Sequence, residues 1–198
     1  MKILISMLYE CVVNDIIISK QNPKKVYLVT VSNNNTEAEI SRLKKKFTMI
    51  SIEPIVIKEF DVVGSTQKIN QIIKREKGNQ IYVNVTEGRK TMVLAGVFAA
   101  SINKEIVEGV YYLRQDNHEL MPIPLPDFVL SETKLKILKE LEKGITNVAE
   151  INKKVKVNRS LVYASIKELT KGGYIKKDKA ISDAGKIALL AAENERER

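Results

Sequence analysis

The chain has 198 residues and carries 33 Lys and Arg against 24 Asp and Glu, a formal net charge of +9. Its 44% of hydrophobic residues suffice for a core, which argues against a disordered tail. A single cysteine, Cys11, and a single histidine, His118, exclude a disulfide scaffold and a Cys/His zinc site, and we expect both to be structural. The longest apolar run, residues 92–100, is about half the length of a membrane span. Because Glu10 and Asp15 also interrupt any signal-peptide pattern, we expect a cytoplasmic protein with no membrane partner.

The basic charge is concentrated in the last third of the chain. Residues 1–130 have a net charge of +3 and residues 131–198 a net charge of +6. The segment 146–181 alone holds nine basic residues against three acidic ones, which accounts for the whole +6. Such a patch favours polyanion binding through release of counterions. A solvated Lys-rich surface would give the same charge, so charge alone leaves both interpretations open.

Alternating prolines indicate where the chain divides. Pro122, Pro124 and Pro126 forbid a helix and favour extended backbone. We place the joint near residues 125–131, which gives a first domain over residues 1–127 and a second over residues 128–198.

Short apolar runs alternate with helix-like stretches along the first domain. This order predicts an α/β fold, a Rossmann-like parallel sheet with helices on both faces and an edge hairpin formed by residues 110–113 and 120–123. Ligands of such sheets bind outside the carboxyl ends of the strands, so we expect the chemistry in the loops after strands one and four. The strands are expected at residues 2–8, 26–32, 52–58 and 81–86, buried on both faces, and the helices at 11–20, 36–47, 65–77 and 90–102.

The loop after the fourth strand, residues 84–92, reads Asn-Val-Thr-Glu-Gly-Arg-Lys-Thr-Met and leads straight into an apolar helix. A glycine turn, two hydroxyls and two cations at a helix N-terminus suit a phosphate. An ordinary capped turn with solvated cations fits the spacing equally well. Neither a Walker A loop nor a Gly-x-Gly-x-x-Gly motif occurs, so ATP hydrolysis and hydride transfer have no motif here. The groups that suit the phosphate belong to Thr86, Gly88, Arg89, Lys90 and Thr91.

The end of the first strand should lie beside this loop. Ser6 and Tyr9 would then face the phosphate, and Tyr9 has a ring that could stack on a nucleobase. A tyrosine that closes the top of the core is the alternative.

The second domain has the pattern of a winged helix-turn-helix. Helices are expected at residues 132–143, at 146–154 with Thr146 as the N-cap, at 158–171, and from Ser182 onward. Residues 174–181 read as two short strands around a charged tip. The third helix of this fold enters the DNA major groove.

One side of the third helix and the wing carry the residues expected to contact DNA. A winged helix used only for protein contacts is the alternative, but the basic excess coincides with these elements, which favours DNA. The expected DNA-binding residues are Lys156, Arg159, Ser160, Tyr163, Lys167, Lys176, Lys177 and Lys179.

With both domains in this order, the chain resembles the CRISPR-associated regulators that join an N-terminal CARF domain to a C-terminal winged helix-turn-helix. Residues 84–92 look like the family's signature after the fourth strand, with Glu87 where a small residue or glycine is usual. The resemblance implies a homodimer through the CARF sheets, a cyclic oligoadenylate such as cyclic tetra-adenylate bound across the two-fold axis, and winged helices on double-stranded DNA. It also implies that the ligand pocket is lined by Ser6, Met7, Leu8, Tyr9, Thr86, Gly88, Arg89, Lys90 and Thr91.

These observations favour a ligand-responsive transcription regulator with no catalytic residue, no metal and no cofactor other than its effector. The main alternative is a ring nuclease, in which the same pocket aligns a ribose hydroxyl with the scissile phosphate while Lys90 or Arg89 stabilises charge. That route needs neither metal nor histidine. A regulator that senses another nucleotide is the third hypothesis.

Overall fold

The computed structural model describes residues 1–9, 13–32 and 34–196, which form two compact units, Met1–Pro126 and Asp127–Arg198. The predicted boundary after residue 127 lies one residue from this division. Cys11, and with it the expectation that this cysteine is structural, lies outside the described residues. No helix in the described ranges is long and apolar enough to cross a membrane.

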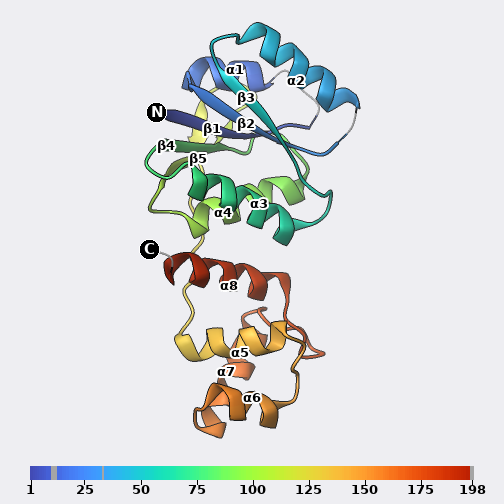
Figure 1. Ribbon diagram of the computed structural model, residues 1–198, viewed down its shortest axis with the longest axis vertical. Coiled ribbons are helices and arrows are strands. Elements are labelled where there is room, and N and C mark those ends of the chain that lie inside the picture. The colour runs from blue at the N-terminus through green and yellow to red at the C-terminus, as the bar shows by residue number, and fades with distance from the viewer. Residues whose placement is uncertain (10–12, 33, 197–198) are drawn as a thin grey trace. The chain divides into compact units, whose positions relative to one another are not determined.

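The first unit is built on a six-stranded sheet in the order β3-β2-β1-β4-β5-β6 (Figure 1). Neighbouring strands run parallel except for β5 and β6, which pair antiparallel as the predicted edge hairpin. The α/β prediction is therefore confirmed. The elements are β1 (Lys2–Met7), α1 (Val13–Gln21), β2 (Lys25–Thr30), α2 (Asn34–Lys46), β3 (Ser51–Val56), α3 (Val62–Arg75), β4 (Gln80–Asn84), α4 (Lys90–Ile102), β5 (Val107–Leu113) and β6 (Leu120–Pro122).

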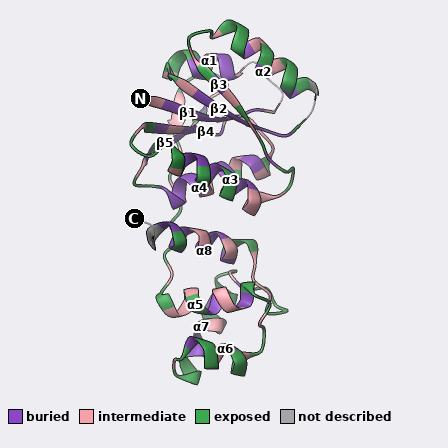
Figure 2. Cartoon of the chain, in the orientation of Figure 1, coloured by how far each residue is buried: buried purple, intermediate pink, exposed green. Residues whose placement is uncertain are grey.

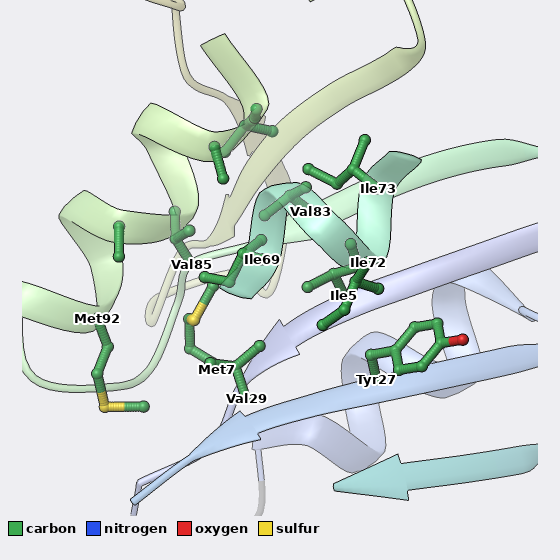
Figure 3. Close-up of a cluster of buried hydrophobic side chains, with 14 of the residues drawn as sticks. Ile5, Met7, Tyr27, Val29, Ile69, Ile72, Ile73, Val83, Val85 and Met92 are labelled. Atoms are coloured by element: carbon green, nitrogen blue, oxygen red, sulfur yellow. The ribbon is translucent and has the colours of Figure 1, made fainter. Parts of the chain in front are cut away.

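The central strands bury both of their faces, as the purple strands of Figure 2 show. Along β1, Ile3, Ile5 and Met7 pack in one cluster with α3 and α4, whereas Leu4 packs in a second cluster with α1 and α2. Figure 3 shows the first cluster, with Met7 and Met92 near the start of α4. This alternation follows from the two-residue period of a strand.

The third strand departs from the prediction that all four strands are buried on both faces. In β3, three of the six residues are exposed, Ser51, Pro54 and Val56, and only Ile52 is fully buried. The reason is its position, because β3 is the edge strand and pairs only with β2. Its Ile and Val content could not distinguish an edge strand from a central one.

A charged cluster closes the amino end of the sheet. The Tyr27 hydroxyl donates a hydrogen bond to the Glu76 carboxylate, and Lys25 Nζ lies 3.2 Å from Glu76 Oε1. Burial by itself would raise the pKa of Glu76, but these hydrogen bonds and the nearby charges of Lys25 and Arg75 outweigh it and hold the pKa below its ordinary value. The folded state therefore favours the ionised form of Glu76.

This lowered pKa gives a pH-dependent contribution to stability. Because the folded pKa lies below the unfolded one, the contribution is present above the unfolded value of about 4.3 and is lost as the pH falls. We expect Glu76→Gln to lower the free energy of unfolding by about 1 to 3 kcal/mol at pH 7. In urea titrations that deficit should shrink towards pH 3, and Glu108→Gln, at an exposed carboxylate on β5, is the matched control. A deficit that stays constant from pH 7 to pH 3 would contradict the assignment.

The second unit consists of α5 (Glu132–Glu142), α6 (Val148–Val155), α7 (Arg159–Lys171) and α8 (Asp183–Arg196). Its core combines apolar side chains of all four helices, including Leu138, Ile151, Val162 and Leu189. One side of α7 faces this core, since Val162 and Leu169 are buried and Ile166 packs against the same cluster.

Two details of the second unit differ from the prediction. The N-cap of α6 is Asn147 and not Thr146, because the Asn147 side chain accepts hydrogen bonds from the N–H groups of Ala149 and Glu150. Asparagine and threonine are both good caps, so the sequence offered two adjacent candidates. The wing holds a single bridge between Ile175 and Ile181 instead of two strands, since a tight turn occupies the residues between them.

Candidate functional site

The strand order places the site at the reversal point between β1 and β4. These two strands are neighbours in the sheet. β2 and β3 lie on the side of β1, and β5 lies on the side of β4, so the order of the strands reverses between β1 and β4. Ser6 of β1 is paired in register with Asn84 of β4, so their carboxyl ends lie side by side. The segments after both strands therefore meet at one edge of the sheet, as predicted from the β-α order.

A buried polar network fixes the segments at this edge. The Ser6 hydroxyl donates to Asn14 Oδ1 at 2.6 Å and accepts from Asn84 Nδ2 at 2.9 Å. The Thr86 hydroxyl donates to Asn84 Oδ1 at 2.6 Å and accepts from the Leu113 N–H at 2.8 Å. The network joins β1, α1, β4 and β5, so it holds the start of the 84–92 loop in one position.

Burial separates the predicted ligand-binding residues into two groups. The side chains of Ser6, Met7 and Leu8 are completely buried, Met7 in one core cluster and Leu8 in the other. These side chains therefore lie behind the surface of the site in this structure. The expectation that residues 6–9 line a ligand pocket stays a prediction. Tyr9 is half-buried and remains at the edge of the core.

Gly88 makes the turn that leads into α4. Its φ of +101° is a conformation that side-chain-bearing residues rarely adopt. A Cβ there would also lie 3.1 Å from Met7 Cβ and 3.3 Å from Met92 Cβ. The buried Met7 therefore helps to explain why glycine stands in this loop.

The N-terminus of α4 follows directly. Arg89 is the N-cap residue but makes no side-chain cap hydrogen bond, and Lys90 is exposed. The Thr91 hydroxyl is buried and has no hydrogen-bond partner among the described residues. The helix end thus combines an exposed cation with a positive dipole end that the Arg89 side chain does not cap.

Two cavities open at this edge, and Tyr9 lines both of them. The first, of about 350 Å³, lies over the loop after β4 and the β5–β6 hairpin; the second, of about 420 Å³, lies over the ends of β2 and β3. The first is lined by Tyr9, Val13, Thr86, Glu87, Gly88, Leu113, Arg114, Gln115 and His118. The second is lined by Tyr9, Val31, Ser32, Val56, Ile57, Glu59 and Arg89.

Residues at the ends of β2, β3 and β5 also line the two cavities, and these residues were not predicted from the sequence. Val31, Ile57 and Glu59 follow parallel strands whose carboxyl ends reach the same edge, so the predicted β-α order contained the signal. His118 lines the first cavity with Arg114, although it was expected to be only structural. The hairpin formed by β5 and β6 was predicted, but residue spacing could not show that it lies beside the loop after β4.

Two charged residues of the 84–92 loop, Glu87 and Arg89, line different cavities. Glu87 lines the first cavity, and its Oε2 lies 3.5 Å from Asn14 Nδ2 in the buried network. Arg89 lines the second cavity and forms an ion pair with Glu59. No three His, Cys, Asp or Glu side chains in the described part of the chain gather closely enough to hold a metal ion.

The second unit presents a separate candidate site, a nucleic-acid interface. Every residue predicted to contact DNA is exposed, on the turn before α7, on α7 or on the wing. Tyr163 is 49% exposed, and the Arg159 guanidinium lies 5.7 Å from the centre of its ring. The Asn158 side chain caps α7 by accepting from the Ser160 N–H, which fixes the end of the helix that carries Arg159.

Ion pairing distinguishes these cations from most of the other basic residues of the unit. Lys134, Lys143 and Lys154 form ion pairs with glutamates. No described acidic residue pairs with Lys156, Arg159, Lys167, Lys176, Lys177 or Lys179. The uncompensated positive charge of the unit therefore includes all six cations predicted to contact DNA.

A sheet domain with a candidate site at its strand reversal is followed in this chain by a helix-turn-helix domain with an exposed basic helix, α7. Residues 6–118, more than half of the chain, match the family model described as HFX_2341_N-like, N-terminal, and the chain belongs to that family. Residues 131–177 match the helix-turn-helix model of the bacterial regulatory protein arsR family. The resemblance to regulators that join a CARF domain to a winged helix-turn-helix is thereby confirmed.

Solved structures with a similar fold share little sequence with this chain, and no curated protein matches it. Protein VC1899 from Vibrio cholerae has 13% identity and a TM-score of 0.50, over 98% of this chain and 58% of that one. Can2 from Sulfobacillus thermosulfidooxidans, solved with cyclic tetra-adenylate, has 15% identity and a TM-score of 0.49, over 100% and 65%. A type III CRISPR defence DNA nuclease activated by cyclic oligoadenylate has 12% identity and a TM-score of 0.49, over 86% and 35%. The chain thus spans at most about two thirds of the length of these proteins.

Proposed function

We propose that the protein is a transcription regulator that binds a cyclic oligoadenylate through its sheet domain and double-stranded DNA through its winged helix. The observation that carries the proposal is the joint presence of a family-matched sheet domain with two cavities at its strand reversal and an arsR-type helix-turn-helix with uncompensated cations. The first unit supplies a pocket for the effector, and the second supplies the DNA contact. We propose cyclic tetra-adenylate as the effector, with no further cofactor.

The proposed effector fits the chemistry of the site. Lys90 and the N-terminal end of α4 suit a phosphate, and the half-buried Tyr9 ring between the two cavities suits a nucleobase. A ring of four identical nucleotides can have a two-fold axis, so a homodimer could bind one ring with two equivalent pockets. The outer face of α4 supports a dimer, because Leu94 is 44% exposed and lies beside the half-buried Val93 and Val97.

Titration calorimetry of the full chain with cyclic tetra-adenylate tests the effector. We expect one ring per two chains, and we expect Lys90→Ala to weaken binding about tenfold, because a charge-assisted phosphate contact is lost. Lys44→Ala, at an exposed lysine of α2, removes the same charge elsewhere in the unit and should leave binding unchanged. Equal affinities of the two variants would contradict the placement of the phosphate.

The same samples decide between binding and cleavage. Under the proposal, chromatography of the ligand after incubation shows the intact ring. Linear products would instead indicate the ring-nuclease alternative.

A further inference from the structure

Arg89 is held away from the first cavity by three neighbours. Its Nε pairs with Glu59, and its guanidinium lies 4.7 Å from the ring centre of Tyr9 and 5.4 Å from that of Phe60. Glu59 and Phe60 belong to the turn between β3 and α3, which is far from Arg89 in sequence. Nothing in the 84–92 motif predicts this contact.

We infer that Glu59 is an affinity-determining residue of the proposed site, an internal anion that occupies Arg89 until a ligand phosphate displaces it. The inference rests on the proposed function, because it takes an anionic nucleotide as the ligand. Glu59 and Arg89 both line the second cavity, so a ligand that enters it meets the pair directly. The side chains are 38% and 39% exposed, which leaves the pair accessible to a competing anion.

The turn that presents Glu59 is held in an unfavourable conformation. The Asp61 N–H donates to the Lys58 carbonyl at 3.3 Å, so Glu59 and Phe60 form the corner of the turn. Phe60 has a φ of +65°, a conformation suited to glycine or asparagine at this position, and its side chain is 70% exposed. A bulky residue in such a conformation is held there by its surroundings, and the ring contact with Arg89 is one of the contacts that hold it.

Competition of this kind sets the ligand concentration at which the site fills. Binding of a phosphate to Arg89 requires the Glu59 carboxylate to give up its partner, and the freed carboxylate then repels the ligand. Because the cost is electrostatic, it falls only on anionic ligands. Removing the charge of Glu59 should therefore tighten binding of a nucleotide without adding any contact.

The test is calorimetric titration of the full chain with cyclic tetra-adenylate. We expect Glu59→Gln to bind about fivefold more tightly than the wild type, a factor that corresponds to about 1 kcal/mol, the upper range for a half-exposed ion pair. Glu108→Gln, which removes one exposed carboxylate at the amino end of β5, should bind like the wild type. In an Arg89→Ala background the effect of Glu59→Gln should be smaller, because no ion pair has to break and only the repulsion by the carboxylate remains.

The outcomes distinguish failure of this inference alone from failure of the proposed function. If the wild type binds and Glu59→Gln binds no more tightly than Glu108→Gln, the competition is wrong while the effector assignment stands. Weaker binding by Glu59→Gln would also overturn it, because Glu59 would then orient Arg89 for the ligand. If neither the wild type nor Glu59→Gln binds cyclic tetra-adenylate, the inference and the effector assignment fail together. Unchanged thermal midpoints of the variants verify that all of them are folded.

Discussion

Arg159→Ala should reduce the discrimination between operator and random DNA by about 1 to 3 kcal/mol, the range for loss of one bidentate base contact. Arg159 stands in the first turn of α7, exposed and unpaired with any described acid, and an arginine in this position of a recognition helix reaches base edges. Binding to DNA of the chain's own promoter and to random DNA, compared at one salt concentration, gives the discrimination directly. Lys136→Ala on α5 removes one positive charge from the same unit and is the control.

The wing should behave differently from α7. Lys177 and Lys179 lie in the turn between the bridged Ile175 and Ile181, where lysines contact phosphates and not bases. Their replacement should weaken binding to both DNAs alike and flatten the dependence of affinity on salt. If Arg159→Ala and the wing variants leave promoter binding unchanged, α7 and the wing are not the DNA interface.

The fold could be predicted because its signals are local. The apolar run 92–100 lies between Lys90 and Asn103, and the helix was predicted over its observed bounds. The edge character of β3 was not local, because it depends on which strand becomes its neighbour. Asn147 and Thr146 are adjacent and both are favourable N-cap residues, so the sequence alone does not determine at which of them α6 begins.

The candidate site was predictable only in its sequence-continuous part. The 84–92 motif identified Gly88 and the start of α4. The positive φ of Gly88 and the proximity of Met7 explain why a glycine occupies this position. The predicted first strand, residues 2–8 buried on both faces, already implied that Met7 and Leu8 are buried, whereas the family resemblance placed them in the pocket. The motif could not show that Arg89 meets Glu59, because that contact joins two loops at the ends of different strands.

The largest effect expected at the level of the whole protein is coupling between the effector and DNA. The effector site is proposed for the first unit and the DNA site for the second. The segment from the end of β6 to the second unit contains Pro124 and Pro126, which make it stiffer than a glycine-rich linker. Two winged helices of a dimer must match half-sites about one helical turn apart, so a ligand that changes their spacing changes the affinity for DNA. Typical couplings of about 1 to 3 kcal/mol correspond to factors of about 5 to 150.

The most direct measurement is the affinity of the full chain for its promoter DNA with and without saturating cyclic tetra-adenylate. We predict that the two affinities differ by at least about fivefold, and that promoter DNA changes the affinity for the ligand by the same factor, as linkage requires. Lys90→Ala should reduce the effect at a fixed ligand concentration without changing the DNA affinity of the ligand-free protein. Equal DNA affinities with and without bound ligand would contradict the account, because the pocket would then serve something other than control of DNA binding.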